Sequence, residues 1–119
     1  MVSSQVPQSP SCRAHKFGGS SLADASRIRH VASLMLGAGE PRQVVVVSAM
    51  QGTTNALIAM TTAAAAGEDW QAAWSALRTQ HADAASALLE APAELHAWID
   101  ARFADIADLL RAVSLLRQP

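Results

Sequence analysis

A short loop near the start of the chain combines a lysine, two glycines and two serines. Residues 16–21 read KFGGSS, and an amphipathic stretch follows them. Glycines lack a Cβ atom, so the backbone there can approach an anion closely, and the lysine adds a full positive charge. A helix that starts behind the loop would add unpaired N–H groups and its positive dipole end. These are the parts of a phosphate-binding loop, although a glycine pair at a strand end often only permits a tight turn.

The order of these residues separates the loop from the P-loop of the common NTPases. That P-loop reads GxxxxGK[ST], so its lysine follows the glycines. Here Lys16 precedes Gly18 and Gly19. The sequence therefore predicts phosphate binding by a loop of another kind.

A second polar cluster follows the most apolar run of the chain. Residues 44–47 are four valines, and residues 48–55 read SAMQGTTN. Hydroxyls and amides at the start of a helix commonly serve as helix caps. They can also hold a small carboxylate, together with the N–H groups of the helix. Both interpretations stay open on these residues alone.

The elements around the two clusters predict a βαβ unit. Residues 13–17 form the first expected strand, and a helix is expected to start near Ser21, with Asp24 close to its positive end. Residues 43–48 read QVVVVS, a β-branched run without polar alternation between its ends, which is typical of a strand covered on both faces. In a right-handed βαβ unit, the loops at 18–21 and 48–54 lie at the same edge of the sheet.

Apolar spacing predicts which side of the first helix is buried. The expected inner positions repeat at i, i+3, i+4 and i+7, whereas Arg27 and Arg29 are expected to face outward. The inner positions are Ile28, Val31, Ala32 and Met35.

Three further helices are expected after the second strand. The first opens at 52–55 and ends at Gly67, the next is capped by Asp69, and Pro92 separates it from the last. The last two are expected to form an antiparallel hairpin, with His81 and the three tryptophans packed in the core or between helices. The coarse order is β-α-β-α-α-α. The apolar residues expected on the last helix are Leu95, Trp98, Ile99, Phe103, Ile106, Leu110 and Val113.

Composition narrows the classes of partner. The chain has 119 residues, is 50% hydrophobic and carries a formal net charge of −1, so nothing predicts nucleic-acid or membrane binding. Residues 1–12 are interpreted as a mobile leader.

Cys12 is the only cysteine in the sequence, which favours a reducing cytoplasm over a disulfide framework. The four histidines lack metal-site spacing, His30 is expected on a solvated face, and no metal ligand is predicted.

Together, the two clusters resemble motifs of the aspartate kinases in the amino acid kinase family. That family opens with K-F-G-G-T/S-S and continues with V-V-V-S-A-x-x-G-x-T-N. Here the motifs stand at 16–21 and 45–55, separated by a helix of suitable length. The resemblance implies that residues 13–119 are the N-terminal part of the catalytic domain, which has a three-layer α/β fold. The chain would then be helix-rich, with an incomplete parallel sheet.

The resemblance implies ATP-dependent phosphorylation of the side-chain carboxylate of L-aspartate, the first step toward lysine, threonine and methionine. Lys16 would neutralise charge on the transferring phosphoryl group, while Gly18, Gly19 and Ser20 would bind ATP phosphates through the backbone. Ser48 and Thr54 would bind aspartate. Mg²⁺ would be held by the phosphates rather than by a protein ligand in this segment. Ser20 departs mildly from the commoner threonine, since both carry a hydroxyl.

The resemblance also implies that other parts of the family's active site lie beyond Pro119. The chain alone is therefore expected to show no kinase activity, because the parts of such a site act as a unit. Whether the full protein is a bifunctional aspartokinase–homoserine dehydrogenase stays open. Two alternatives remain: an interaction module that self-associates through an open sheet edge and apolar helix faces, and a related kinase acting on another carboxylate or carbamate.

Overall fold

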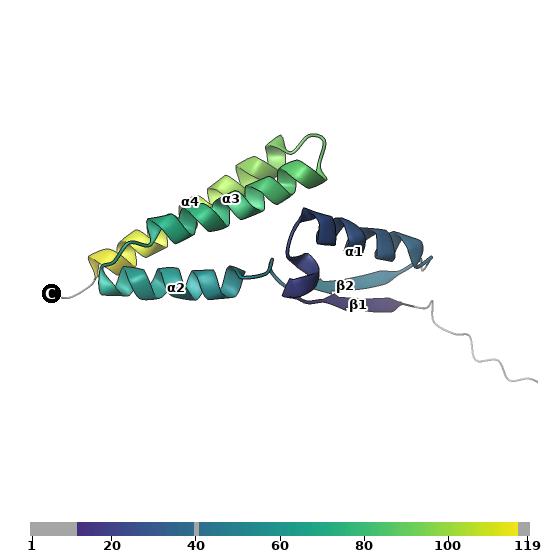
Figure 1. The fold of residues 1–119 in the computed structure, drawn as a ribbon, viewed down its shortest axis with the longest axis horizontal. Coiled ribbons are helices and arrows are strands. Elements are labelled where there is room, and N and C mark those ends of the chain that lie inside the picture. Colours follow the sequence, from purple (N-terminus) through teal and green to yellow (C-terminus); the bar gives the residue numbers. More distant parts are fainter. Residues whose placement is uncertain (1–11, 40, 117–119) are drawn as a thin grey trace, which may run out of the picture.

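The computed structural model describes residues 12–39 and 41–116, so the predicted leader falls outside the described residues except for Cys12. The elements follow the predicted order β-α-β-α-α-α, with one 3₁₀ helix inserted before the first α-helix (Figure 1). The chain is a helix-rich α/β structure. Its elements are β1 (Arg13–Phe17), η1 (Gly19–Leu22), α1 (Ala25–Gly37), β2 (Gln43–Val47), α2 (Thr53–Ala66), α3 (Gln71–Leu88) and α4 (Ala93–Leu115).

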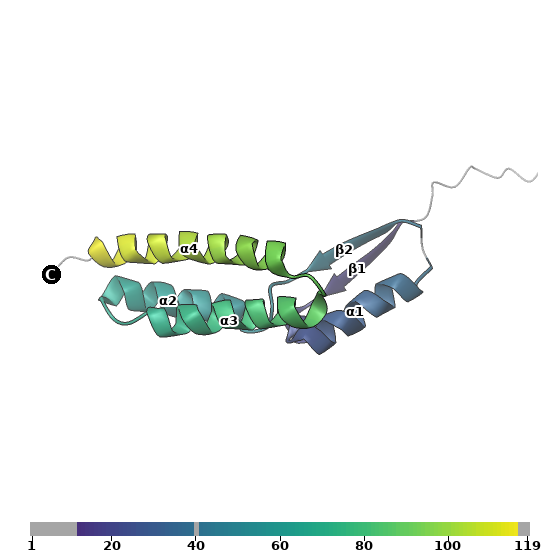
Figure 2. The ribbon, with the colours of Figure 1, turned by 90° about the horizontal axis from the view of Figure 1, so that it is seen from above.

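The two strands form a parallel sheet, as predicted. Arg13 pairs with Gln43 at one end of the ladder and Phe17 pairs with Val47 at the other. In Figures 1 and 2, α1 runs along the strands that it connects. The parallel pairing confirms the expected βαβ unit, and the carboxyl ends of both strands meet at one edge.

The expectation that the valine strand is covered on both faces is wrong for the residues that the structure describes. Val44 and Val46 are 50% and 52% exposed, whereas Val45 between them is half-buried. Alternate residues of a strand point to opposite faces, so one face is covered and the other is open. The physical reason is that α2, α3 and α4 pack on one another instead of on the second face of this sheet.

The start of α1 also differs from the prediction. Ser21 lies inside the 3₁₀ helix, where its N–H donates to the carbonyl of Gly18 at 3.0 Å. The helix is instead capped by Asp24, whose Oδ1 accepts from the N–H of Arg27 at 2.9 Å. A carboxylate at the N-cap satisfies a free N–H and lies at the positive helix end, so Asp24 displaces the serine from that role.

The inner face of α1 is only partly as predicted. Val31 is buried, Ile28 and Met35 are half-buried, and Ala32 is exposed. Arg27 and Arg29 are exposed, as expected. The two-stranded sheet is narrow, so it covers only a narrow stripe of α1.

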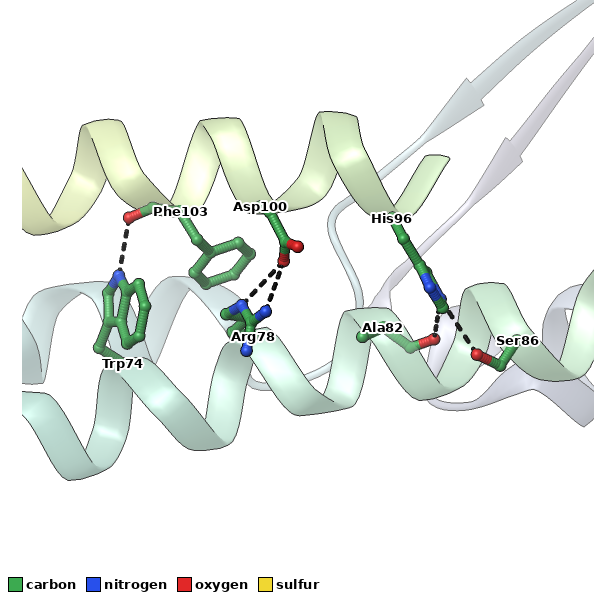
Figure 3. A network of polar contacts seen from close by, with 7 residues as sticks. All are labelled: Trp74, Arg78, Ala82, Ser86, His96, Asp100 and Phe103. Carbon is green, nitrogen blue, oxygen red and sulfur yellow. Dashed lines mark hydrogen bonds and ion pairs between the residues drawn. The ribbon is translucent and has the colours of Figure 1, made fainter. Parts of the chain in front are cut away.

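The main core lies between the last three helices, which lie alongside one another in Figures 1 and 2. α3 and α4 form the predicted antiparallel hairpin around Pro92, and the indole Nε1 of Trp74 donates to the carbonyl of Phe103 at 2.8 Å (Figure 3). The ring of His81 packs against Phe103 with centroids 5.7 Å apart, which confirms its place in the hairpin. The buried core residues are Met60, Ala64, Trp70, Leu77, Ala85, Ile99, Phe103, Ala107 and Leu110.

Trp98 departs from the prediction that all three tryptophans are buried. Its side chain is 60% exposed, and the guanidinium of Arg102 lies 5.6 Å from its ring centroid. Leu95, one turn earlier, is also exposed. Trp98 and Leu95 lie beside the face of α4 that packs on α2 and α3, so they are outside the core. The prediction from their helical spacing with Ile99 is therefore wrong for these two residues.

Asp69 lies two residues before the start of α3, so the N-cap position itself is Trp70 and the predicted cap is displaced by one residue. Its Oδ1 accepts from the N–H of Gln71 at 2.8 Å. This bond satisfies one of the free N–H groups of the first helical turn.

Among the helices of the described residues, none combines the length and the apolar character that crossing a membrane requires.

Candidate functional site

The sheet register brings the two polar clusters together. Phe17 and Val47 form the last pair of the ladder, and the N–H of Ser48 donates to the carbonyl of Phe17 at 3.1 Å. Both loops therefore leave the sheet at the same edge. A Cβ atom added at Gly19 would lie 3.7 Å from the Oγ of Ser48 and 3.5 Å from the Cα of Gln51. The predicted proximity of the two loops is confirmed.

An open pocket of about 250 Å³ lies where these loops meet. Gly19 contributes from the first loop, and the turn before α2 together with the first turn of that helix contributes the rest. The lining residues are Gly19, Ser48, Ala49, Met50, Gln51, Gly52, Thr53, Thr54 and Asn55. The pocket thus collects hydroxyls, amides and backbone groups, and it contains no carboxylate or basic side chain among the described lining residues.

The turn before α2 depends on a glycine. Gly52 has φ 86° and ψ −8°, the left-handed region that residues with a Cβ rarely adopt. This conformation reverses the chain between the strand and the helix, so that Thr53 donates its N–H to the carbonyl of Met50 at 3.1 Å. A backbone requirement therefore explains the glycine of the second motif.

The N-terminus of α2 presents free donors to the pocket. Ala56 donates to the carbonyl of Gly52 at 2.9 Å, but the N–H groups of Thr54 and Asn55 have no backbone acceptor within the described residues. Both residues line the pocket. Unpaired N–H groups and the positive end of the helix dipole favour an anion at this position.

Two predicted aspartate-binding residues, Ser48 and Thr54, both line this pocket. The hydroxyl of Ser48 is exposed and donates to the carbonyl of Ala49 at 2.8 Å. Thr54 is exposed at the first turn of α2. Their roles in binding aspartate stay predictions, but the structure does place the two side chains at one site.

The predicted phosphate-binding residues are divided. Gly19 lines the pocket, whereas Lys16, Gly18 and Ser20 lie outside the lining within the described part of the chain. Lys16 is an exposed residue of β1, paired in register with Val46. Gly18 is extended, with φ −85° and ψ 179°, and the carbonyl of Ser20 accepts from Nη1 of Arg27 at 3.2 Å. These three residues therefore neighbour Gly19 in sequence without lining the pocket.

Thr53 belongs to the polar cluster predicted at 48–55, but it was not assigned an individual role in binding aspartate. Its Oγ1 is buried without a hydrogen-bond partner among the described residues. Buried hydroxyls are nearly always bonded, so an unpaired one beside a pocket marks a polar position that a ligand or water can satisfy. The run of two threonines and an asparagine at a helix start was the available signal.

Gln80 on α3 was also missed. Its Nε2 donates to the carbonyl of Gln51 at 3.3 Å, which ties the pocket loop to a helix 29 residues further along the chain. Met50, on the same loop, lines both this pocket and a neighbouring one of about 340 Å³ beside α1 and α3. Contacts between distant segments leave no local pattern, so no sequence signal could have identified Gln80.

Within residues 12–39 and 41–116, no group of three or more His, Cys, Asp or Glu side chains could hold a metal ion.

The parallel βαβ unit, with a pocket at its carboxyl edge, places this chain among the α/β proteins, in which ligands bind outside the carboxyl ends of the strands. The profile of the amino acid kinase family matches residues 12–115. This chain belongs to the amino acid kinase family.

The similar sequences are aspartokinases. The chain is 31% identical over 113 residues to the chloroplastic bifunctional aspartokinase/homoserine dehydrogenase 2 of Arabidopsis thaliana, a match that covers 92% of this chain and 12% of the relative. It is 52% identical over 44 residues to the bifunctional aspartokinase/homoserine dehydrogenase 2 of Escherichia coli, which covers 37% of this chain and 5% of the relative.

Solved structures of E. coli aspartokinase III share the fold. The complex with lysine and aspartate, in the T-state, superposes with a TM-score of 0.77 and 26% identity, covering 93% of this chain and 24% of that one. The R-state complex with aspartate and ADP gives a TM-score of 0.72, also with 26% identity, over 92% of this chain and 24% of that one. The chain therefore spans only a fraction of the length of the proteins that it matches.

Proposed function

We propose that this chain forms part of an ATP-dependent aspartate kinase, which phosphorylates the side-chain carboxylate of L-aspartate to give 4-phospho-L-aspartate. One observation carries the proposal: the two motif loops meet at the carboxyl edge of the sheet and share a pocket that contains Gly19, Ser48 and Thr54. The solved complexes of aspartokinase III with aspartate, and with aspartate and ADP, support these two substrates.

The pocket suits a carboxylate that must be held without proton transfer to the protein. The hydroxyls of Ser48 and Thr54 and the free N–H groups at the start of α2 are all neutral donors. Neutral donors can bind a carboxylate and still leave it nucleophilic. Phosphoryl transfer needs mainly positioning and charge stabilisation, so no general base is required in this pocket.

The strand side of the pocket suits phosphate groups. The backbone between Gly18 and Ser20 passes next to the Ser48 loop, and Lys16 supplies the one side-chain cation that the sequence motif contains. In the proposed reaction, an oxygen of the aspartate carboxylate attacks the γ-phosphorus of ATP, and the bond to the β,γ-bridging oxygen breaks as ADP leaves. Lys16 would neutralise the negative charge on the transferring group.

Mg²⁺ accompanies ATP in most phosphoryl transfers. The described residues provide no carboxylate cluster for it. We therefore assign no step to Mg²⁺ in this segment and leave any bound ion to the phosphates.

Two further proposals concern the chain as a whole. We propose that it has no kinase activity alone, because the relatives extend far beyond the matched part and active-site groups act as a unit. We also propose a cytoplasmic location, for which the support is a single cysteine and no disulfide framework.

The binding site can be tested by an NMR titration of the 119-residue chain with L-aspartate and, separately, with ATP. Chemical-shift changes from aspartate are expected at residues 48–55, and changes from ATP at residues 16–20. Ser48→Ala should remove the response to aspartate, because it deletes a hydroxyl of the pocket. A kinase assay of the same sample should give no turnover.

Thr61→Val is the matched control, since the Thr61 hydroxyl lies on the exposed side of α2 and donates to the carbonyl of Leu57. This variant should respond to aspartate like the parent chain. Shifts located elsewhere, or an equal response to L-glutamate or carbamate, would favour the related-kinase alternative. A robust turnover rate would contradict the proposed inactivity.

Self-association is a second candidate property. The open sheet face exposes Val44 and Val46, and Val47 at the end of the strand is exposed as well. Several large apolar side chains on the helices are also exposed. Exposed apolar surface of this kind favours burial against another molecule. We propose that the chain associates with itself.

A further inference from the structure

The outer side of α4 carries a second stripe of residues, distinct from the stripe that packs in the core. Its positions alternate in steps of three and four, as in the contact seam of two packed helices. All seven are exposed. We call this set the outer stripe, and it consists of Leu95, Trp98, Arg102, Asp105, Leu109, Ala112 and Leu116.

Helical geometry separates the outer stripe from the core. At 3.6 residues per turn, its members fall within a sector of roughly 100°, centred about 110° around the helix from the core residues of α4. Leu109 is 68% exposed, although the neighbouring Leu110 is buried. Within the described residues no element covers this sector, so large apolar groups on it remain in water.

The charges of the outer stripe lie at its centre. Nη2 of Arg102 lies 3.2 Å from Oδ2 of Asp105, and the Arg102 guanidinium also lies over the ring of Trp98. Apolar residues flank this pair on both sides, with Leu95 and Trp98 before it and Leu109, Ala112 and Leu116 after it. The stripe therefore has an apolar–charged–apolar layout with one cation and one anion in the middle.

This layout is complementary to itself when it is reversed. If two copies of α4 pack antiparallel about a two-fold axis between positions 102 and 105, each stripe residue from Leu95 to Ala112 meets the residue whose number sums with its own to 207, and Leu116 lies beyond the paired region. Arg102 then faces Asp105 of the second copy, and Trp98 faces Leu109. In a parallel arrangement, by contrast, Arg102 would face Arg102, which is unfavourable.

We propose that the outer stripe of α4 binds the same stripe of a second copy, antiparallel, in a two-fold symmetric dimer. The interface is isologous, so each contact occurs twice. Two Arg102–Asp105 contacts form between the chains, and Trp98 of each copy packs on Leu109 of the other. The inference rests on the proposed self-association and identifies the surface responsible for it.

Two charge variants test the proposal by sedimentation velocity of the full chain. Arg102→Glu places acidic groups opposite each other, and Asp105→Lys places basic groups opposite each other. Each single variant should raise the dissociation constant of the dimer by at least about tenfold, since facing like charges repel. An equimolar mixture of the two should form a heterodimer with at least the parent affinity, because every facing pair is then opposite in charge.

The matched control is Asp108→Lys, which reverses one member of the Arg111–Asp108 pair on another side of α4. This variant should dimerise like the parent chain. Circular dichroism melting of every variant checks that the fold is kept.

A chain that stays monomeric from micromolar to millimolar concentration would overturn both the interface and the proposed self-association. Self-association that survives in both single variants, or a mixture that forms no heterodimer, would overturn only the α4 interface and point to the open sheet face. None of these outcomes bears on aspartate binding, which the NMR titration measures separately.

Discussion

Gly19 is the residue through which the two motif loops approach each other. A Cβ atom at this position would meet the Cα of Gln51, the Oγ of Ser48 and the carbonyl oxygen of Ala49 at 3.5–3.8 Å, which is ordinary van der Waals contact. We therefore expect Gly19→Ala to keep the fold, with a change in stability below about 0.5 kcal/mol. The added methyl group occupies pocket space, so the affinity for ATP should fall by about tenfold in the NMR titration.

Gly37→Ala is the control for this substitution. A Cβ atom at Gly37 would meet nothing within 4 Å, and the residue is the last of α1. It should bind ATP like the parent chain and gain up to about 1 kcal/mol of stability, because alanine favours the helix. Unchanged ATP binding by Gly19→Ala would show that Gly19 only serves the turn.

At this scale the sequence predicted which residue types gather, but it missed their partners. The order of lysine, glycine and serine residues identified the two loops, because the residues of each motif are adjacent in the sequence. The Gln80–Gln51 hydrogen bond joins residues 29 apart and depends on how α3 packs. The pocket could therefore be located from sequence, whereas the residue that braces it could not.

At the scale of elements, α2 is bounded by two glycines in the left-handed conformation. Gly52 before the helix has φ 86°, and Gly67 after it has φ 73°. Replacing either with alanine should lower the free energy of unfolding by about 1–2 kcal/mol, because a Cβ atom strains this conformation. Chemical denaturation of Gly52→Ala and Gly67→Ala measures the two costs.

The two glycines differ in what else they control. Gly52 lines the pocket, and Gly67 is at the opposite end of the helix. Gly52→Ala should therefore also weaken the response to L-aspartate, while Gly67→Ala should leave it unchanged. Equal loss of aspartate binding in both variants would mean that global stability, not the shape of the turn, determines binding.

The order of elements followed from sequence pattern, while their burial did not. Four consecutive valines predicted a strand correctly, but Val44 and Val46 are exposed because the last three helices pack together and leave one sheet face open. Trp98 shares the helical spacing of Ile99 yet lies outside the core. The spacing of apolar residues predicts which face of an element could be buried. Whether another element covers that face depends on the tertiary packing.

At the scale of the whole molecule, the chain has two parts, which differ in how many apolar residues they bury. Figures 1 and 2 show the three-helix part (α2, α3 and α4) and the βαβ part (β1, α1 and β2) following each other along the long axis. The main core lies within α2, α3 and α4, whereas among the described residues the βαβ part contributes only Leu22 and Val31 to the buried apolar residues. Regions with few buried apolar contacts open more readily. Amide hydrogen exchange should therefore be faster in β1, α1 and β2 than in the three-helix part.

One contact between the two parts is made by Arg29. Its Nη2 donates to the carbonyl of Ala87 at 2.6 Å, in the last turn of α3, where free carbonyls and the negative dipole end favour a cation. Arg29→Ala should cost about 1 kcal/mol of docking energy and speed exchange in α1, β1 and β2 by about fivefold. Arg27→Ala is the matched control, because Arg27 contacts only Ser20 of the same part through its side chain within the described residues. Faster exchange throughout α2–α4 in Arg29→Ala would instead mean that the two parts unfold as one unit.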